Sequence, residues 1–404
     1  MTRQVTIAVV SDIHAAIPDK DGNNPSYAST APNKDATEKD AILSLHKFIE
    51  AKGIRTDYLV CCGDMADRAN PTAMQYVWNK FHEIAGTLGA KPVVTVGNHD
   101  IDSRFVESDH DARGMLRNLK PTYPLGESSK DYEYWSRNFV ILINDNVRLV
   151  VLNSCAYHGF NPKTDNPEHE HGRVSSHTLS DLRSALSEET KRDLVNLLIC
   201  HHHPHKHQDI ESNDYSSMQG GEKLIDLLRD LDLGPWMIIH GHKHHPRLIH
   251  GAGGALAPLI FGVGSLSAKI HADFQGRSRN QFYILKFDID SAAKLELQVA
   301  GEVSAWDFLL GQGWVPAKVG SGLPSRSGFG YALSHLKKEA RQITAEVDRK
   351  GGVCSWQDIL DSHPHFQFVL PSDLESLAKE LRSGHGVGID YNEHGTPLQL
   401  AKRS

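Results

Sequence analysis

Short apolar runs that stop abruptly at polar residues recur along this chain. The run Val93–Val96 is rich in β-branched residues and ends at Gly97, and Asn98, His99 and Asp100 follow at once. A β-branched run of this length predicts a buried strand, and a glycine after it permits a sharp turn. The pattern therefore predicts a rigid strand that presents three polar side chains at its end.

Four other apolar runs show the same arrangement. They are Val5–Val10, Tyr58–Cys62, Leu197–Cys200 and Trp236–His240. The polar residues that follow them are Asp12 and His14, Asp64, His201-His202-His203-Pro204, and His242 and His244. In open α/β sheets, ligands bind beyond the carboxyl ends of the strands. We therefore expect the five strand ends to converge on one cleft.

Between these runs the pattern alternates between helices, loops and further strands. Helical spacing predicts helices over Asp35–Lys52, from Pro71 to Gly86 or Gly89, over Ser176–Leu186 and over Glu222–Leu231. Strands are predicted at Phe139–Ile143 and Val147–Leu152, which form a hairpin, and at Leu259–Val263, Phe282–Phe287 and Leu295–Val299, which close a second sheet. Residues 15–34 and 101–135 are expected to be loops, the latter a flap that faces the substrate.

The C-terminal part of the chain has a different pattern. Residues 316–330 are rich in Gly, Pro and Ser and are expected to link a main domain, 1–315, to a module, 331–404. Helices are predicted at Tyr331–Lys350, Ser355–Asp361 and from a capping box at Ser372–Glu375 to Gly384, then a hairpin over Gly386–Leu400. This outline resembles a winged helix. Because Lys379 and Arg382 are balanced by acidic residues on the third helix, protein contact or oligomerisation is favoured over DNA binding.

Composition narrows the class of protein. The 404 residues are 39% hydrophobic and 23% charged, which is typical of a soluble globular protein. The net charge of −7 disfavours broad attraction to nucleic acid or to an anionic membrane. The run Val5–Val10 is too short for a signal peptide, and the five cysteines are odd in number and lack disulfide-like spacing. We therefore expect a cytoplasmic protein without a membrane partner.

The residues at the five strand ends suit a pair of metal ions. In this hypothesis Asp64 bridges both ions, because a carboxylate has two oxygens to share. Asp12, His14 and His244 complete one site, and Asn98, His202 and His242 complete the other. Such a mixture of nitrogen and oxygen ligands suits Mn²⁺, iron, Zn²⁺ or Co²⁺ better than Mg²⁺ or Ca²⁺.

Two metal ions suit a hydrolytic reaction, and in this hypothesis the reaction takes place at phosphorus. A hydroxide between the ions would have a pKa near neutrality and would attack the phosphorus atom in line. His99 is not needed as a ligand and is predicted either to donate a proton to the leaving oxygen or to stabilise charge. Asp100 is predicted to fix the orientation of His99.

Taken in order, the motifs Asp-x-His, Gly-Asp, Gly-Asn-His-Asp, His-x-Pro and Gly-His-x-His resemble those of the calcineurin-like metallophosphoesterase superfamily. The resemblance extends from residue 5 to about residue 300. It implies a sandwich of two mixed β-sheets flanked by helices, with the metal ligands and the acid at the positions named above. It also implies that the ligand lies two residues before Pro204, which selects His202 and leaves His201 as the alternative.

The resemblance leaves the substrate open. His171–Ser175 is loosely similar to the cyclic-nucleotide and nucleotide phosphodiesterase branch, and there Arg173 either contacts phosphate or is an ordinary solvated side chain. The leading hypothesis is a hydrolase of a small phosphodiester, such as a nucleotide. The alternatives are a nuclease that uses the same site and a non-catalytic scaffold of the same fold.

Overall fold

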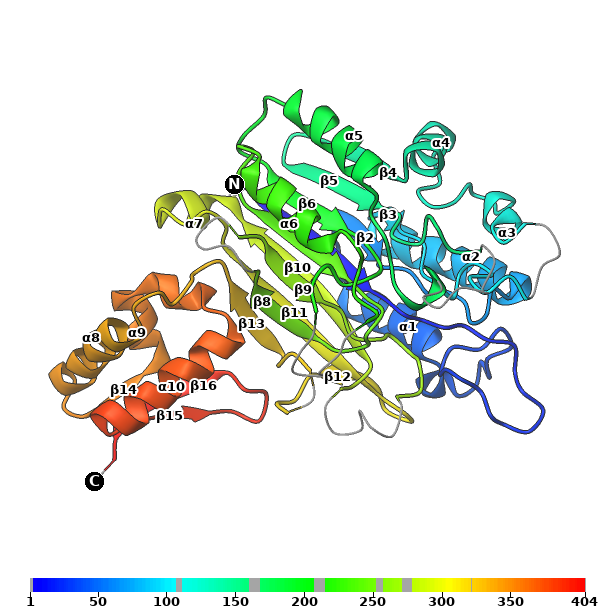
Figure 1. The fold of residues 1–404 in the computed structure, drawn as a ribbon. Coiled ribbons are helices and arrows are strands. Elements are labelled where there is room, and N and C mark those ends of the chain that lie inside the picture. The colour runs from blue at the N-terminus through cyan, green and yellow to red at the C-terminus, as the bar shows by residue number, and fades with distance from the viewer. Residues whose placement is uncertain are drawn as a thin grey trace.

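Two mixed β-sheets pack face to face and are flanked by helices, and a smaller module follows at the C-terminus (Figure 1). The computed structural model describes residues 3–106, 111–159, 168–206, 215–251, 257–270, 278–320 and 322–403. This architecture confirms the predicted fold class.

The first sheet has the strand order β12-β11-β10-β1-β2-β3, and β13 also pairs with β11. Strands β1, β2 and β3 are parallel, whereas β10 lies antiparallel to β1. The bounds are β1 Gln4–Val10, β2 Tyr58–Cys61, β3 Lys91–Val94, β10 Gln281–Asp288, β11 Gly301–Leu309, β12 Gly313–Pro316 and β13 Arg326–Phe329. The carboxyl ends of the three parallel strands therefore open on the same edge.

The second sheet has the strand order β4-β5-β6-β7-β9-β8. Its four central strands are parallel, and β4 and β8 are antiparallel edges. The bounds are β4 Phe139–Ile143, β5 Val147–Leu152, β6 Val195–Ile199, β7 Trp236–His240, β8 Arg247–His250 and β9 Leu259–Gly262. The predicted hairpin of β4 and β5 is confirmed.

The main core lies between the sheets. It joins Ile7 and Val60 of the first sheet with Leu197 and Ile239 of the second. The neighbouring residue Leu198 points to the opposite face of its strand and packs in a second cluster with helices α5 and α6. The helices of this part are α1 Ala41–Lys52, α2 Pro71–Leu88, α3 Gly114–Arg117, α4 Ser128–Arg137, α5 Ser176–Ser187, α6 Gly221–Asp230 and α7 Ile289–Lys294.

The C-terminal module has the element order and the sheet of a winged helix. Its elements are α8 Leu336–Arg349, β14 Val353–Ser355, α9 Trp356–Ser362, α10 Pro371–His385, β15 Val387–Tyr391 and β16 Pro397–Lys402. The three strands pair in the order β14-β16-β15. Ile343, Leu377 and Leu400 belong to a separate core. The predicted hairpin is confirmed. The capping box at Ser372 is wrong, because α10 begins at Pro371 without a side-chain cap.

Three other expectations from the sequence are corrected. Residues 295–299 are not a strand, because α7 precedes them and the strand is β11. Strand β10 joins β1 in the first sheet rather than closing a second one. The predicted linker contains β13, in which a Cβ at Gly328 would lie 2.2 Å from the backbone oxygen of Gln367. This strand needs small residues because the backbone of another segment approaches it closely. Linkers are also rich in small residues, and composition therefore could not distinguish the two.

The cap of α1 gives a test of how the first loop is held. Asp40 Oδ1 accepts hydrogen bonds from the Ile42 and Leu43 N–H groups, and its Oδ2 accepts one from Ser29. We expect Asp40→Ala to lower the free energy of unfolding by about 1–2 kcal/mol, measured by urea denaturation. Asp40→Asn should lose less, and Asp35→Ala, at an exposed position, should change little. Equal losses for Asp40→Ala and Asp35→Ala would contradict this account.

Candidate metal centre

The polar loops that follow β1, β2, β3, β6 and β7 meet at one edge of the sandwich. The Asp12 N–H donates to the Gly63 carbonyl, and the Gly241 N–H donates to that of His201. Non-glycine residues with positive φ gather here: Asp12, His14, Asp64, His242 and His244 have φ of 50°, 50°, 54°, 74° and 51°. Such conformations cost energy and concentrate at functional sites. The predicted convergence of the loops is confirmed.

One group of side chains surrounds Asp12 and His14. His244 Nε2 lies 3.2 Å from Asp12 Oδ1 and 3.2 Å from His14 Nε2. His14 Nε2 lies 3.6 Å from Asp64 Oδ2. Asp12, His14 and Asp64 are buried. These contacts bring together all four residues that the sequence assigns to the first ion.

A second group forms on the other side of the same Asp64 oxygen. Asn98 Oδ1 lies 2.9 Å from His201 Nε2 and 3.1 Å from His242 Nδ1. His201 Nε2 also lies 3.4 Å from Asp64 Oδ2. The other ring nitrogen of His201 donates to the Cys62 carbonyl over 2.8 Å, which orients the ring and makes Nε2 the nitrogen that is available to a metal ion. The shared atom in both groups is Asp64 Oδ2.

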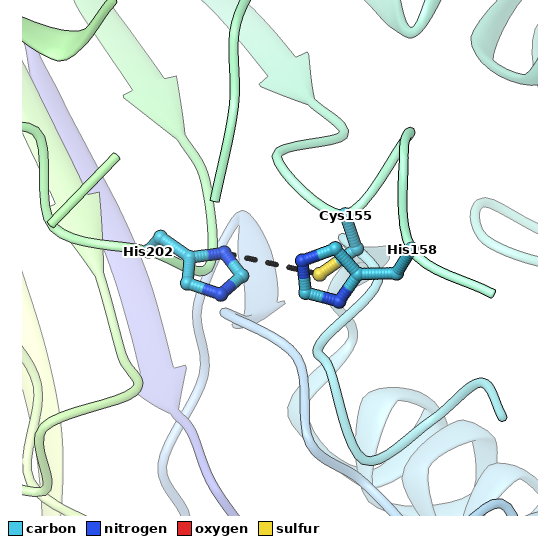
Figure 2. A group of neighbouring side chains, drawn as sticks. All are labelled: Cys155, His158 and His202. Atoms are coloured by element: carbon cyan, nitrogen blue, oxygen red, sulfur yellow. Dashed lines mark hydrogen bonds between the residues drawn. The ribbon is translucent and has the colours of Figure 1, made fainter. Parts of the chain in front are cut away.

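His202, which the sequence prefers as a ligand, is held differently. Figure 2 shows its ring beside Cys155 and His158, with Nδ1 at 3.9 Å from the Cys155 Sγ. Its Nδ1 also lies 2.9 Å from the Ser154 hydroxyl, and its buried Nε2 has no hydrogen-bond partner among the described residues. One nitrogen of His202 is within 4.8 Å of the ring nitrogens of both His201 and His242. The contacts with Asp64 and Asn98 nevertheless belong to His201.

Asp100 makes contacts other than the predicted one with His99. Its carboxylate accepts backbone N–H bonds from Asp64, Met65, Ala66 and Gly97, at 2.6–3.1 Å, and so clamps the loops after β2 and β3 together. A carboxylate that has these four donors is a structural anchor. From the sequence alone, an aspartate directly after His99 could either orient the imidazole or anchor backbone N–H groups.

His99 is oriented instead by Asp67, which sequence reasoning missed. His99 Nδ1 lies 3.2 Å from Asp67 Oδ1, and the His99 N–H donates to Asp64 Oδ1 over 2.7 Å. The His99 side chain is 38% exposed, so it can reach a bound molecule. Burial opposes protonation of His99, but the carboxylates of Asp64 and Asp67 raise its pKa above the ordinary value. The signal available in the sequence was the spacing Gly-Asp-x-x-Asp.

The electrostatics of the site favour a bound cation. Burial raises the pKa of Asp64, but the surrounding histidines, His201 first, outweigh burial and hold it well below its usual range. Burial lowers the pKa of His201, but the adjacent Asp64 raises it to about 9. Burial lowers the pKa of His242 and of His202 well below the ordinary value. A charged aspartate thus faces a protonated His201, whose proton an incoming ion must displace, while His242 is held in the neutral state in which imidazoles bind metal.

Arg173 is not available as a free phosphate contact. Its Nε lies 3.0 and 2.9 Å from the two carboxylate oxygens of Glu168. Its backbone N–H donates to the Ser154 carbonyl. The guanidinium is therefore paired with Glu168, and the Arg173 side chain is 34% exposed.

The chemistry of the donor set fits metal ions. Carboxylate oxygens, an amide oxygen and imidazole nitrogens face one another at about hydrogen-bond distance, although several of these atoms are acceptors only. Acceptors gather in this way where a cation neutralises them. Asp12, His14 and His244, and also Asp12, Asp64 and His201, have ligand atoms within 4.8 Å of one another.

Comparison with known proteins identifies the family. A family model described as calcineurin-like phosphoesterase matches residues 5–246, which is more than half of the chain. The chain therefore belongs to the calcineurin-like phosphoesterases, a family of phosphoester hydrolases. A second family model, wHTH-Calcineurin_assc, matches residues 327–383 in the C-terminal module.

Two curated relatives share part of this length. A probable cyclic nucleotide phosphodiesterase of Rhodococcus erythropolis is 26% identical over 197 residues, which is 49% of this chain and 54% of that protein. A cAMP/cGMP dual specificity phosphodiesterase of Mycobacterium tuberculosis is 24% identical over 207 residues, 51% of this chain and 54% of that protein. The chain thus spans about half the length of these relatives.

Among solved structures, the purple acid phosphatase PPD1 of yellow lupin covers 77% of this chain and 53% of its own. Its TM-score is 0.46 at 12% sequence identity. Separately, no helix among the described residues has the length and apolarity that crossing a membrane requires.

The raised pKa of His201 predicts a pH dependence of metal binding. Below a pKa of about 9 the metal-free imidazole carries a proton that an incoming ion must displace. Mn²⁺ affinity should therefore rise by up to about tenfold per pH unit from pH 7 and level off near pH 9. Calorimetry in buffers of different ionisation enthalpy should detect the released proton.

Two variants control this measurement. His201→Gln should abolish the pH-dependent proton release, whereas the exposed His335→Gln should preserve it. An affinity for Mn²⁺ that stays constant over this pH range in the unmodified protein would contradict the assignment of the proton to His201.

Proposed function

We propose that this chain is a two-metal phosphodiesterase that hydrolyses a small phosphodiester, with a nucleotide as the leading substrate class. The observation that carries the proposal is the position of Asp64 Oδ2, which lies 3.6 Å from His14 Nε2 and 3.4 Å from His201 Nε2. One carboxylate oxygen at the junction of two donor groups is suited to bridging a pair of cations.

The ligand sets follow from these contacts. Asp12, His14, Asp64 and His244 would hold one ion, and Asp64, Asn98, His201 and His242 the other. His201 thus replaces His202 in the set inferred from sequence. A pair of Mn, Fe, Zn or Co ions bound there would acidify a water molecule and polarise the phosphoryl oxygens.

The chain's own residues supply the remaining chemistry. His99 is held by Asp67 and is partly exposed beside Asp64, which supports a role for its protonated imidazole in donating a proton to the leaving oxygen. The raised pKa of His99 keeps the proton available near neutral pH. Asp100 keeps the loops of Asp64 and His99 in register through its four backbone contacts.

A small diester is favoured over the alternatives. The names of the two curated relatives support a cyclic nucleotide or a related diester. The scaffold alternative loses support because every ligand type is present and the donor atoms converge. The cytoplasm remains the proposed location.

The C-terminal module does not support the nuclease alternative. We propose that this module consists of residues 331–404 and that β13 belongs to the catalytic unit. The face of α10 that carries Leu374, Ala378 and Arg382 lines a cavity of about 1610 Å³ shared with Pro246 and Arg326 of the catalytic unit. The face thus borders a cavity that the module shares with the catalytic unit. Its mixed charge favours a contact with protein over one with nucleic acid.

Activity against a general diester tests the proposal. Bis-(p-nitrophenyl) phosphate with added Mn²⁺ should be hydrolysed, and Asp64→Asn should lower kcat/KM by at least about 100-fold, because it removes the shared ligand. The exposed Asp35→Asn serves as the matched control and should be unaffected. A substrate panel of cyclic nucleotides, phosphomonoesters and nucleic acids identifies the class. No turnover with any metal would refute the proposal.

The role of His99 predicts a dependence on the leaving group. We expect His99→Ala to lower kcat by about 10²–10⁴-fold for an alkyl leaving group, which needs a proton, and by less for p-nitrophenolate. Asp67→Asn should show a smaller loss with the same dependence. Metal content, measured by mass spectrometry, should remain at two ions per chain. An equal loss of kcat for both leaving groups would argue against proton donation by His99.

A further inference from the structure

Two buried residues outside the ligand set hold the loop that carries Asn98. The Ser103 hydroxyl donates to the Asn98 carbonyl oxygen over 2.5 Å and lies 3.0 Å from His158 Nδ1. Ser103 is 8% exposed and His158 is 1% exposed. Neither residue belongs to the strand-end motifs, and His158 lies in a different loop, after β5.

The imidazole of His158 is itself fixed by a third segment. Its Nε2 lies 2.9 Å from the carbonyl oxygen of His171, which only accepts, so Nε2 carries the ring proton. Burial lowers the pKa of His158 to about 4, and the ring is therefore neutral near pH 7. Its Nδ1 is then an acceptor, so the single Ser103 proton is shared between the Asn98 carbonyl and His158 Nδ1.

These contacts add to others between the same two loops, such as the one from the Cys155 Sγ to the Val96 carbonyl. The Gly159 N–H donates to the Ser103 carbonyl, and the His158 N–H donates to that of Cys155. The loop after β3 is thus tied to the loop after β5. Asn98 carries an anchored backbone carbonyl and, on its side chain, the Oδ1 atom that contacts His201 and His242.

We propose that Ser103 and His158 are positioning residues that hold Asn98 in place and thereby set the affinity of the second metal site. This inference rests on the proposed function, because it requires that Asn98, His201 and His242 bind an ion. Residues that hydrogen-bond behind a metal ligand typically change metal affinity by 10–100-fold when they are lost. The first site, which contains no atom of the Asn98 loop, should be insensitive to them.

The same neighbourhood offers a competing interpretation as a third metal site. Cys155, His158 and His202 have ligand atoms within 4.8 Å of one another (Figure 2). Both nitrogens of His158 are, however, engaged with Ser103 and His171, and burial raises the pKa of the Cys155 thiol well above its ordinary value. Metal binding needs a thiolate and a free imidazole nitrogen. The geometry therefore points to hydrogen bonds from His158 and Ser103 to Asn98, which we call the relay, rather than to a metal site.

The test is a Mn²⁺ titration of the purified full-length chain, with bound and free metal separated by equilibrium dialysis and no substrate present. Ser103→Ala should weaken the second Mn²⁺ by about 10–100-fold and leave the first unchanged. Ser103→Thr, which keeps the hydroxyl, should restore the affinity. His158→Gln keeps a donor toward His171 and should lose less than His158→Leu. Ser327→Ala is the matched control, because Ser327 has a buried hydroxyl without a hydrogen-bond partner among the described residues.

The outcomes separate this inference from the function on which it rests. Two Mn²⁺ ions with unchanged affinities in Ser103→Ala would overturn the relay and leave the proposed function intact. Equal weakening of both ions, or a loss that Ser103→Thr does not repair, would also overturn it. A third ion that disappears in His158→Leu would show that Cys155, His158 and His202 bind metal instead. No Mn²⁺ in the unmodified protein would overturn the proposed function itself.

Discussion

A fully buried carboxylate at the meeting point of five loops is the constraint on which the rest of this structure depends. Asp64 is 2% exposed, and its Oδ2 faces histidines from two different loops. An isolated carboxylate so placed would be costly, and burial of this kind persists only where opposite charge or hydrogen bonds compensate. Asp64 Oδ1 accepts a hydrogen bond from the His99 N–H, and the backbone N–H of Asp64 donates to the Asp100 carboxylate.

Close packing of backbone around that carboxylate explains the glycines that precede the polar residues. A Cβ at Gly97 would lie 2.1 Å from Asp64 Oδ1, and one at Gly63 would lie 2.6 Å from the Gly97 nitrogen. Only glycine lets the two loops approach so closely. The glycines of these motifs therefore serve contact between loops as well as the turn of each loop.

The sequence was informative where the spacing of hydrophobic residues and the type of the polar residues that follow indicate the same feature. The apolar run Trp236–His240, for example, predicted the bounds of β7 correctly to the residue. The polar residues after such runs predicted which side chains belong to the site. It was uninformative where one residue type serves two purposes. Asp100 and Asp67 are both aspartates near His99, and only the fold shows that Asp100 anchors backbone while Asp67 contacts the imidazole. His201 and His202 are adjacent histidines in the loop after β6, and only the fold shows that His201 contacts Asp64 and Asn98 while His202 contacts Ser154.

The account is tested most directly by crystals grown with Mn²⁺ and measured at the manganese absorption edge. It predicts two anomalous peaks about 3.5–4 Å apart, with Asp64 Oδ2 between them, His244 on one peak, and Asn98 and His201 on the other. An anomalous map with no peak beside Asp64, or with its only peak between Cys155, His158 and His202, would contradict the account.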